Sequence, residues 1–393
     1  MMINNGESKK RMGLYIHLPF CVRKCNYCDF VSGIYDDGVK KEYVRALLKE
    51  IGSLDRKYDT DLSDTEIETV YFGGGTPGSI NASFIENIMN TVRDNLRVRD
   101  DAEISIEINP GIVDDEKLRI YKANGINRIS IGLQSANDDE LKLLGRIHTY
   151  RDFEECYDMV RNRGFDNVSV DIITALPDQS MEMLDNTLDR LTRKDPEHIS
   201  AYSLIIEEGT PFYKLYGEGG SKREMLLCED EERRMYYHTE RLLSEYGYER
   251  YEISNFAKPG YRSRHNISYW KRIPYIGAGL CAAGLINEVR YKNTDDMGKY
   301  IAHSDDLLSI DERIVINREE QMDETVFLGL RMTDGVDIGN FSDRFGVSLK
   351  ERYKKEIDKL CDQELITIDE RILKLTSKGI DYGNYVFSCF YNI

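Results

Sequence analysis

The chain has 393 residues, a hydrophobic content of 41%, a charged content of 31% and a formal net charge of −17. Such an acidic surface repels phosphate backbones, and Lys and Arg are scattered, which argues against nucleic acid as a partner. No apolar run approaches the roughly 20 residues that cross a bilayer, and the polar start lacks the features of a secretory signal. We therefore expect a soluble, cytoplasmic protein with reduced cysteines, built as a large α/β domain plus a smaller one.

The first predicted elements are a mobile segment over 1–12 and a strand over 13–18. A loop follows that holds three cysteines in C-x-x-x-C-x-x-C spacing, Cys21, Cys25 and Cys28. Thiolates at this spacing suit a soft metal or an iron–sulfur cluster. A structural zinc site normally has four ligands, so three cysteines favour a cluster with one open iron. The alternatives are a zinc site with a distant ligand such as His17, or three unrelated thiols.

A helix is predicted over 38–57 and a strand over 67–72, which runs directly into Gly73–Gly74–Gly75–Thr76–Pro77. Glycines at a strand end allow the backbone to come very close to a ligand, because no Cβ intervenes. Taken alone, this segment would more often be a plain tight turn. Its position after the cysteine loop favours a binding role.

Strands and helices alternate through the next part of the chain. Strands are predicted over 103–108, 128–133, 168–173 and 198–206, and helices over 81–97, 114–124, 137–145, 150–163 and 181–193. This alternation predicts a parallel α/β architecture, although periodicity does not separate an open sheet from a barrel. Polar side chains lie at or just past the strand ends, where parallel barrels place their sites: Glu107, Gln134, Arg146 and Asp171. A lone Glu in a strand is more often solvated, and Arg146 with Asp171 could instead form a structural ion pair.

The second half of the chain is less periodic. We predict a loop over 207–224, a helix over 226–247, a strand over 248–253, an irregular region around 264–270 and tight backbone packing over 277–284. Two helices over 317–330 and 349–363 then precede a hairpin over 365–368 and 372–375, a winged-helix pattern. Because the chain is acidic, a structural cap is favoured over DNA binding.

The cysteine spacing together with the Gly-Gly-Gly-Thr-Pro segment resembles the radical S-adenosylmethionine (SAM) superfamily. Across nearly the whole chain, the sequence is most similar to the branch that contains anaerobic coproporphyrinogen dehydrogenase and the HemW-type haem chaperones. The resemblance implies a partial (βα)6 barrel over 13–225, a haem-associated extension over 226–310 and a winged-helix-like domain over 311–393. It also implies a 4Fe–4S cluster on the three cysteines, with SAM on the fourth iron and a deoxyadenosyl radical formed when SAM is reductively split.

The resemblance also assigns roles to individual residues. Tyr15, Gly74, Gly75, Thr76 and Glu107 match residues near SAM, and Gln134, Arg146 and Asp171 match residues that the dehydrogenase uses around its cofactors, including a second SAM. The chemistry of these groups is suitable. A carboxylate can accept hydrogen bonds from ribose hydroxyls or an amine, and an Arg can hold a carboxylate.

Two departures separate the members of this branch. The dehydrogenase has a further cysteine where this chain has Phe30, and a sizeable extension where this chain has only twenty residues before Cys21. Both departures resemble the haem chaperones, as does the segment His265–Asn266–Ile267–Ser268–Tyr269–Trp270, which matches an H-N-x-x-Y-W motif. A His can ligate haem iron and aromatic rings can flank a porphyrin, although outside the motif His265 would more often be ordinary packing.

The favoured prediction is a haem chaperone that binds a 4Fe–4S cluster, SAM and haem and delivers haem to an acceptor protein. Contact with a membrane-bound haem enzyme is compatible with this prediction. The alternative is the dehydrogenase itself, which decarboxylates coproporphyrinogen III to protoporphyrinogen IX. A different radical reaction such as methyl transfer has no supporting second cysteine pair. The sequence indicates neither the oligomeric state nor whether SAM is cleaved.

Overall fold

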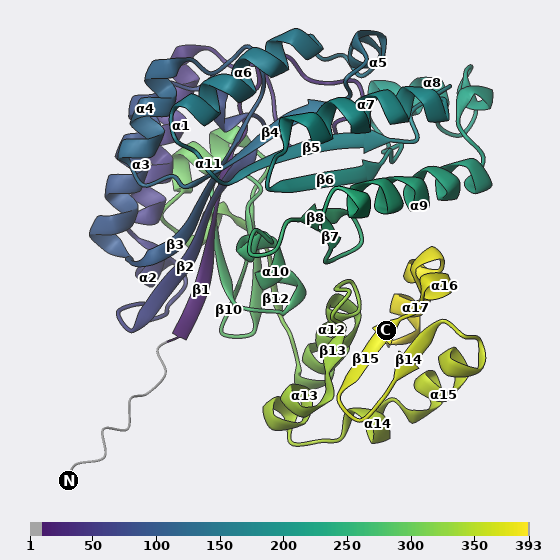
Figure 1. The fold of residues 1–393 in the computed structure, drawn as a ribbon. Helices are drawn as coiled ribbons and strands as arrows, with labels where there is room; N and C mark the ends of the chain where they lie inside the picture. Colours follow the sequence, from purple (N-terminus) through teal and green to yellow (C-terminus); the bar gives the residue numbers. More distant parts are fainter. Residues whose placement is uncertain (1–9, 392–393) are drawn as a thin grey trace.

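The computed structural model describes residues 10–391, in which a twelve-stranded sheet forms the centre of the molecule. Six parallel strands pair in sequence order and make up the predicted partial barrel (Figure 1). They are β1 (Lys10–Leu18), β2 (Thr65–Gly74), β3 (Arg97–Ile108), β4 (Arg128–Gln134), β5 (Val168–Thr174) and β6 (His198–Ser203). The predicted fold class is therefore confirmed. Residues 1–9 of the segment predicted to be mobile lie outside the described part, and Lys10–Met12 belong to β1.

The two faces of these strands differ in polarity. On β4, Ile129, Ile131 and Leu133 are fully buried and belong to the main hydrophobic core, whereas Arg128 and Ser130 alternate with them. Successive side chains of a strand point to opposite faces, so apolar residues pack under the helices and polar residues line the inner face. The covering helices are α1 (Asp37–Ile51), α2 (Leu54–Lys57), α3 (Ala82–Asn95), α4 (Asp115–Ala123), α5 (Asp138–Leu143), α6 (Tyr150–Asn162) and α7 (Met181–Lys194). The inner polar face is the surface on which a site can be built.

Several predicted bounds in this half are corrected by the structure. The single helix predicted over 38–57 is two helices, which Gly52 and Ser53 separate. The helix predicted over 81–97 ends at Asn95, and β3 begins at Arg97 rather than at 103, because its early residues pair with β2. The strand predicted over 198–206 ends at Ser203.

The sheet continues beyond both edges of the parallel part. At one edge β9 (Tyr275–Ala278) pairs with β1, followed in space by β10 (Ala283–Ile286), β11 (Val289–Asn293) and β12 (Ile310–Val315). At the other edge lie β8 (Asn255–Ala257) and β7 (Glu249–Arg250). The strand predicted over 248–253 is thus much shorter. Strands β9 and β10 require the small residues of this region, since a Cβ on Gly277 would lie 2.0 Å from the Ala283 carbonyl oxygen.

Four α-helices lie between β6 and β12, and the sequence predicted one of them. The loop predicted over 207–224 contains α8 (Pro211–Tyr216), which Thr210 caps and Pro211 starts. The predicted long helix is α9 (Glu229–Glu245), the supposedly irregular region contains α10 (Arg264–Trp270), and α11 (Met297–His303) follows β11. Ser263 caps α10, and the Glu103 carboxylate accepts hydrogen bonds from the backbone N–H groups of Arg264 and His265. The start of α10 is thus fixed by a local cap and by a residue about 160 positions earlier, and the second contact is invisible in the local sequence.

The C-terminal unit, yellow-green in Figure 1, has its own hydrophobic core and a three-stranded sheet in the order β13-β15-β14. Its elements are α12 (Arg318–Gly329), β13 (Val336–Asp337), α13 (Ile338–Phe345), α14 (Leu349–Arg352), α15 (Lys354–Asp362), β14 (Ile366–Ile368), β15 (Ile372–Leu375), α16 (Ser377–Asp381) and α17 (Gly383–Cys389). The predicted helices and hairpin are present, with the second helix split at Tyr353 and with β13 and α13 unpredicted. The predicted domain limits stay a proposal. The predicted limit between residues 310 and 311 falls inside β12, which pairs with β11 in the large sheet. No helix among residues 10–391 is long and apolar enough to span a membrane.

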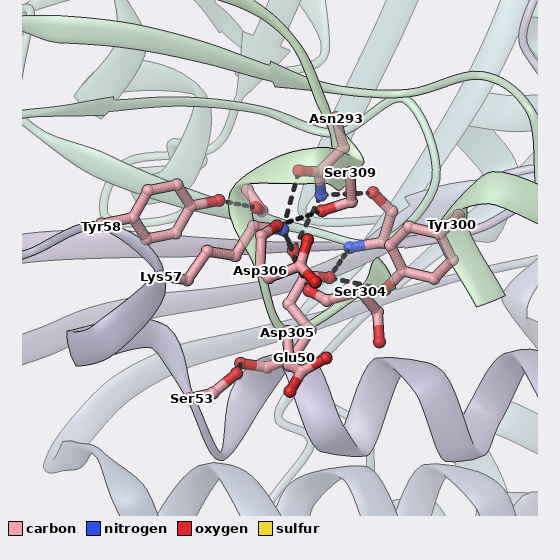
Figure 2. Close-up of polar contacts among 12 residues, drawn as sticks. Glu50, Ser53, Lys57, Tyr58, Asn293, Tyr300, Ser304, Asp305, Asp306 and Ser309 are labelled. Carbon is pink, nitrogen blue, oxygen red and sulfur yellow. Dashed lines mark hydrogen bonds and ion pairs between the residues drawn. The ribbon is translucent and has the colours of Figure 1, made fainter. Parts of the chain in front are cut away.

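A buried polar network joins the first helices to the extension (Figure 2). The Glu50 carboxylate accepts hydrogen bonds from Lys57 Nζ at 2.5 Å, Asn293 Nδ2 at 2.8 Å, the Gly279 N–H at 2.7 Å and the Tyr300 hydroxyl at 2.5 Å. The side chains of Glu50 and Lys57 are fully buried. Because each carboxylate oxygen has two donors, the charge of Glu50 is compensated despite its burial.

We predict that Lys57→Met destabilises the protein by about 3–5 kcal/mol, because it leaves the Glu50 charge buried without its cation. The free energy of unfolding in urea measures this loss. Arg56→Met is the matched control on the same short helix, since the Arg56 side chain is 71% exposed beside Asp305 and its loss costs about 1 kcal/mol or less. Equal losses in the two variants would contradict the prediction.

Candidate functional site

The cysteine loop leaves the C-terminal end of β1 and is tied to neighbouring elements by backbone hydrogen bonds. The Cys21 N–H donates to the Gly33 carbonyl at 2.9 Å, which closes the loop on itself. The Asn26 N–H donates to the Leu144 carbonyl at 2.9 Å, and the Phe212 N–H donates to the Asn26 carbonyl at 2.9 Å. The loop is therefore fixed to the region after α5 and to the start of α8.

The three loop thiols are partly exposed and unpaired. Among residues 10–391, no three His, Cys, Asp or Glu side chains converge closely enough to hold a single metal ion. A 4Fe–4S cluster binds each thiolate through a different iron, so it suits thiols that are near one another without meeting at a point. His17 does not complete a mononuclear site in this arrangement, because its Nδ1 bonds the Tyr15 hydroxyl at 3.0 Å and its Nε2 bonds the Val31 carbonyl at 2.9 Å.

The glycine segment at the end of β2 packs directly beneath the cysteine loop. A Cβ on Gly75 would lie 2.8 Å from the Phe20 carbonyl oxygen and 3.0 Å from Cys21 Sγ. Gly74 has a φ of +112°, and a Cβ there would lie 2.6 Å from the His17 ring. The glycines are required because the two backbones touch, which goes beyond a plain turn.

A chain of polar contacts crosses the mouth of the barrel from the glycine segment to the cysteine loop. Asn109 Nδ2 donates to Thr76 Oγ1 at 2.8 Å, and its Oδ1 accepts from Arg146 Nη2 at 2.5 Å. The same Arg146 guanidinium donates to the Gly132 carbonyl at 2.7 Å and approaches Cys25 Sγ at 3.5 Å. Asn109 is a site residue that the sequence analysis missed, and the signal was its place at the end of a strand just before Pro110.

The structure brings Gln134 to the same point of the mouth. Gln134 has a φ of +71°, and a Cβ on Gly132 would lie 3.0 Å from Gln134 Nε2 and 3.1 Å from Arg146 Nη2. A positive φ at a non-glycine residue is uncommon and gathers at functional sites. Within the described residues no ion pair joins Arg146 to Asp171, whose carboxylate instead accepts a hydrogen bond from Ser130 Oγ at 3.0 Å. The structural ion pair considered from the sequence is therefore absent there.

Glu107 lies deeper on the inner face. Its Oε1 accepts a hydrogen bond from the Tyr71 hydroxyl at 2.8 Å, and its carboxylate also accepts one from the Gly74 N–H. Burial raises the pKa of Glu107 to about 7, and the nearby Asp171 carboxylate adds to the rise. Burial likewise raises the pKa of Asp171 above its usual range. Two carboxyl groups with raised pKa values on one inner face are typical of a binding or reaction site.

His265 lies away from the cysteine loop, at the floor of the inner face. A Cβ on Gly13, four residues before His17 along β1, would lie 3.5 Å from its ring, and the side chain of His265 is almost fully buried. Nδ1 bonds the Thr69 hydroxyl at 2.8 Å and Nε2 bonds the Tyr269 hydroxyl at 2.7 Å. The structure thus gathers the other predicted site residues at and below the mouth and places His265 beneath them.

Comparison of the sequence with known proteins shows the family of this chain. Residues 15–191 match the model of the radical SAM superfamily, and residues 316–382 match that of the HemN C-terminal domain. The haem chaperone HemW of Lactococcus lactis is 33% identical over 97% of this chain and 98% of its own length. The chain belongs to the HemW family of radical SAM proteins.

Another HemW, from Bacillus subtilis, is 35% identical over 96% of this chain and 98% of its own length. Among solved structures, the Escherichia coli coproporphyrinogen III oxidase HemN superposes with a TM-score of 0.83 over 97% of this chain and 90% of that chain. Its sequence identity is 22%, so this likeness concerns the fold. The cysteine loop, the glycine segment and Asp171 all fall inside the matched radical SAM region of this HemW-family chain.

We predict that Gly75→Ala prevents stable assembly of a cluster, because the new Cβ pushes the cysteine loop at Phe20 and Cys21. Iron and sulfide bound per chain after anaerobic reconstitution measure the effect, and we expect most of both to be lost. Gly383→Ala is the control, since its nearest neighbour would be 3.5 Å away. Full iron and sulfide loading of Gly75→Ala would refute this account of the glycine.

We also predict a pH-dependent gain in stability for Glu107→Gln. The folded protein binds the Glu107 proton more tightly than the unfolded chain does, so stability is fully present below the unfolded pKa and is lost as pH rises through about 7. The Gln variant avoids this loss and still accepts the Tyr71 hydrogen bond. Unfolding in urea should show its advantage growing from about pH 5 to about pH 7 and levelling off above that, and Glu155→Gln, at a side chain that is 62% exposed, is the control.

Proposed function

We propose that this protein is a haem chaperone that binds a 4Fe–4S cluster and SAM and delivers haem to an acceptor protein. The observation that carries the proposal is the identity of 33% and 35% to two haem chaperones over nearly the full length of each chain. Phe30 supports it, because this position would be a cysteine in the enzyme of the same branch.

The residues at the mouth fit the two cofactors. Cys21, Cys25 and Cys28 would hold the cluster, and the Arg146 guanidinium beside Cys25 Sγ would offset the negative charge of the thiolates. When bound and reduced, the cluster supplies the electron that splits SAM in this superfamily. Glycines have no Cβ and so allow a ligand to approach the backbone, and Gly74 and its neighbours would position SAM in this way.

The remaining predicted contacts would orient SAM from the sides. Glu107 and Asp171 offer carboxylate oxygens to an amine or to ribose hydroxyls, and Thr76 and Gln134 offer neutral polar groups at the mouth. Tyr15 lies next to this group, with its hydroxyl donating to His17. Each assignment follows the family resemblance and the shared location of these side chains.

Haem is a flat apolar ring, and apolar side chains are unusually exposed around the mouth. Val22, Phe30 and Ile34 on the cysteine loop are 52%, 64% and 69% exposed, and Ile205 just past β6 is 67% exposed. Exposed apolar groups of this size beside a site are typical of a surface that takes an apolar partner. They support haem as the cargo of the same end of the barrel.

Haem ligation by His265 stays a prediction. Both of its ring nitrogens are hydrogen bonded, so an iron could be bound only after the Tyr269 or Thr69 bond is given up. Burial lowers the pKa of His265 to about 3, so the ring is neutral and chemically able to bind a metal once released. We also propose a cytoplasmic location, with the acceptor allowed to be a membrane-bound haem enzyme.

The deciding experiment is anaerobic reconstitution of the cluster, followed by parallel incubation with haem and with coproporphyrinogen III plus SAM and a reductant. We expect about one haem per chain and no protoporphyrinogen. Conversion of coproporphyrinogen with release of deoxyadenosine would establish the dehydrogenase instead, the alternative for which the shared fold is the support.

Cys25→Ala tests the cluster assignment within the same experiment. Removal of one of three thiolates should abolish the visible thiolate-to-iron absorbance and the bound iron. Cys228→Ala is the control, because Cys228 is exposed at the start of α9, far along the chain from the loop. Loss of absorbance in both variants, or in neither, would rule out the three-cysteine site.

A further inference from the structure

Tyr71 orients Glu107, the carboxylate predicted to contact SAM. Tyr71 lies on β2, faces the inner side and donates its hydroxyl proton to Glu107 Oε1 at 2.8 Å. The second donor to this carboxylate is the Gly74 N–H, three residues later on the same strand. Two donors from one strand fix the direction in which Glu107 presents its free lone pairs.

Two other rings pack against the Tyr71 ring. The Tyr15 ring lies with its centroid 6.3 Å away and its plane at 26°, and the His265 ring lies with its centroid 5.0 Å away and its plane at 22°. Roughly parallel neighbours resist rotation of the ring on which they pack, because rotation would lose these contacts. The position of the Tyr71 hydroxyl therefore depends on His265.

His265 is well fixed for this task. Its side chain bonds Thr69 and Tyr269, and its backbone N–H donates to Glu103 Oε1 at 3.0 Å. These partners come from β2, from α10 and from β3, so the ring is anchored to three elements. A neutral imidazole needs one donor and one acceptor partner, and both are present.

We propose that Tyr71 is a positioning residue for Glu107 and that His265 is the ring that holds Tyr71 in place. The H-N-x-x-Y-W segment would then act on the SAM site through packing. This inference rests on the proposed function in one respect, namely that Glu107 contacts SAM.

The charges around Glu107 determine what loss of the Tyr71 hydroxyl would do. Burial is the largest effect and raises the pKa of Glu107, Asp171 on β5 raises it further, and Arg128 on β4 lowers it. The Tyr71 hydrogen bond lowers it, so its removal leaves the carboxyl protonated up to a higher pH. A protonated Glu107 cannot accept from an ammonium or hydroxyl as a carboxylate does, and SAM binding should weaken on the acid side.

The test is Tyr71→Phe, which keeps the stacked ring and removes only the hydroxyl. SAM binding to the anaerobically reconstituted protein is measured by calorimetry between about pH 6 and pH 9. We expect the pH midpoint of SAM affinity to rise by about one unit, the size expected from loss of one hydrogen bond to a charged group, with affinity near pH 9 within about twofold of the parent. An unchanged midpoint would overturn the proposal.

Tyr353→Phe is the matched control. Tyr353 is a fully buried tyrosine of the C-terminal unit, and its hydroxyl donates to a carboxylate other than Glu107, namely Asp323 Oδ1 at 2.6 Å. It should lower stability as Tyr71→Phe does and leave the SAM midpoint in place. An equal midpoint shift in both variants would reduce the role of Tyr71 to general packing and overturn the proposal.

His265→Gln separates positioning from haem ligation. We expect a smaller shift of the SAM midpoint in the same direction, with haem still bound at about one per chain. Loss of haem with an unchanged SAM midpoint would mean that His265 is a ligand and would overturn its assigned role.

A second measurement does not depend on SAM. The stability difference between the parent and Glu107→Gln, followed over pH, reports the folded pKa of Glu107. The same measurement in the Tyr71→Phe background should give a Glu107 pKa about one unit higher. An unchanged pKa would refute the effect of the Tyr71 hydrogen bond on Glu107. Failure of the parent to bind SAM would count against the proposed function. The stability measurement over pH would still decide the role of Tyr71.

Discussion

The contact between the glycine segment and the cysteine loop is the constraint on which the rest of the site depends. A Cβ on Gly75 would lie within 3.0 Å of the backbone N and O of Phe20 and of Cys21 Sγ, so β1 and β2 must end at the same height. Their parallel register, with Leu18 opposite Gly74, delivers that alignment. A side chain at Gly75 would push the cysteine loop away from the strand end that is proposed to hold SAM.

The inner face of the sheet is polar, and this polarity has an energetic cost that the fold meets in two ways. Some buried charges are fully paired, as Glu50 is by four donors and Glu103 is by the start of α10. Others are left partly uncompensated, and burial then raises the pKa of Glu107 and Asp171. The paired charges hold the scaffold, and the uncompensated ones gather where a ligand would complete them, as expected for a site that trades stability for binding.

The sequence allowed good prediction where the physics is local. The parallel strands, the covering helices and the cysteine and glycine segments follow from periodicity and from residues adjacent in the chain. Prediction failed where the determining contact is distant. The α10 helix depends on Glu103, about 160 residues earlier, as a cap, and β9 depends on pairing with β1. Asn109 and Tyr71 were missed because an amide and a phenol acquire their roles only from Arg146 and Glu107 across the sheet.

The α10 helix links the barrel floor to the C-terminal unit, and this explains the H-N-x-x-Y-W spacing. His265, at the second position of the helix, faces the barrel and stacks on Tyr71. Trp270, at its last position, lies under the Arg331 guanidinium, whose Cζ is 4.4 Å from the ring centroid. Trp270 also packs against a small apolar cluster that contains Met332, which follows α12 in the chain. Residues five apart on a helix lie on different sides, so one short helix can contact both units at once. His265 therefore packs in the barrel and Trp270 packs on the C-terminal unit, so these two contacts account for a flat ring at each end of the motif.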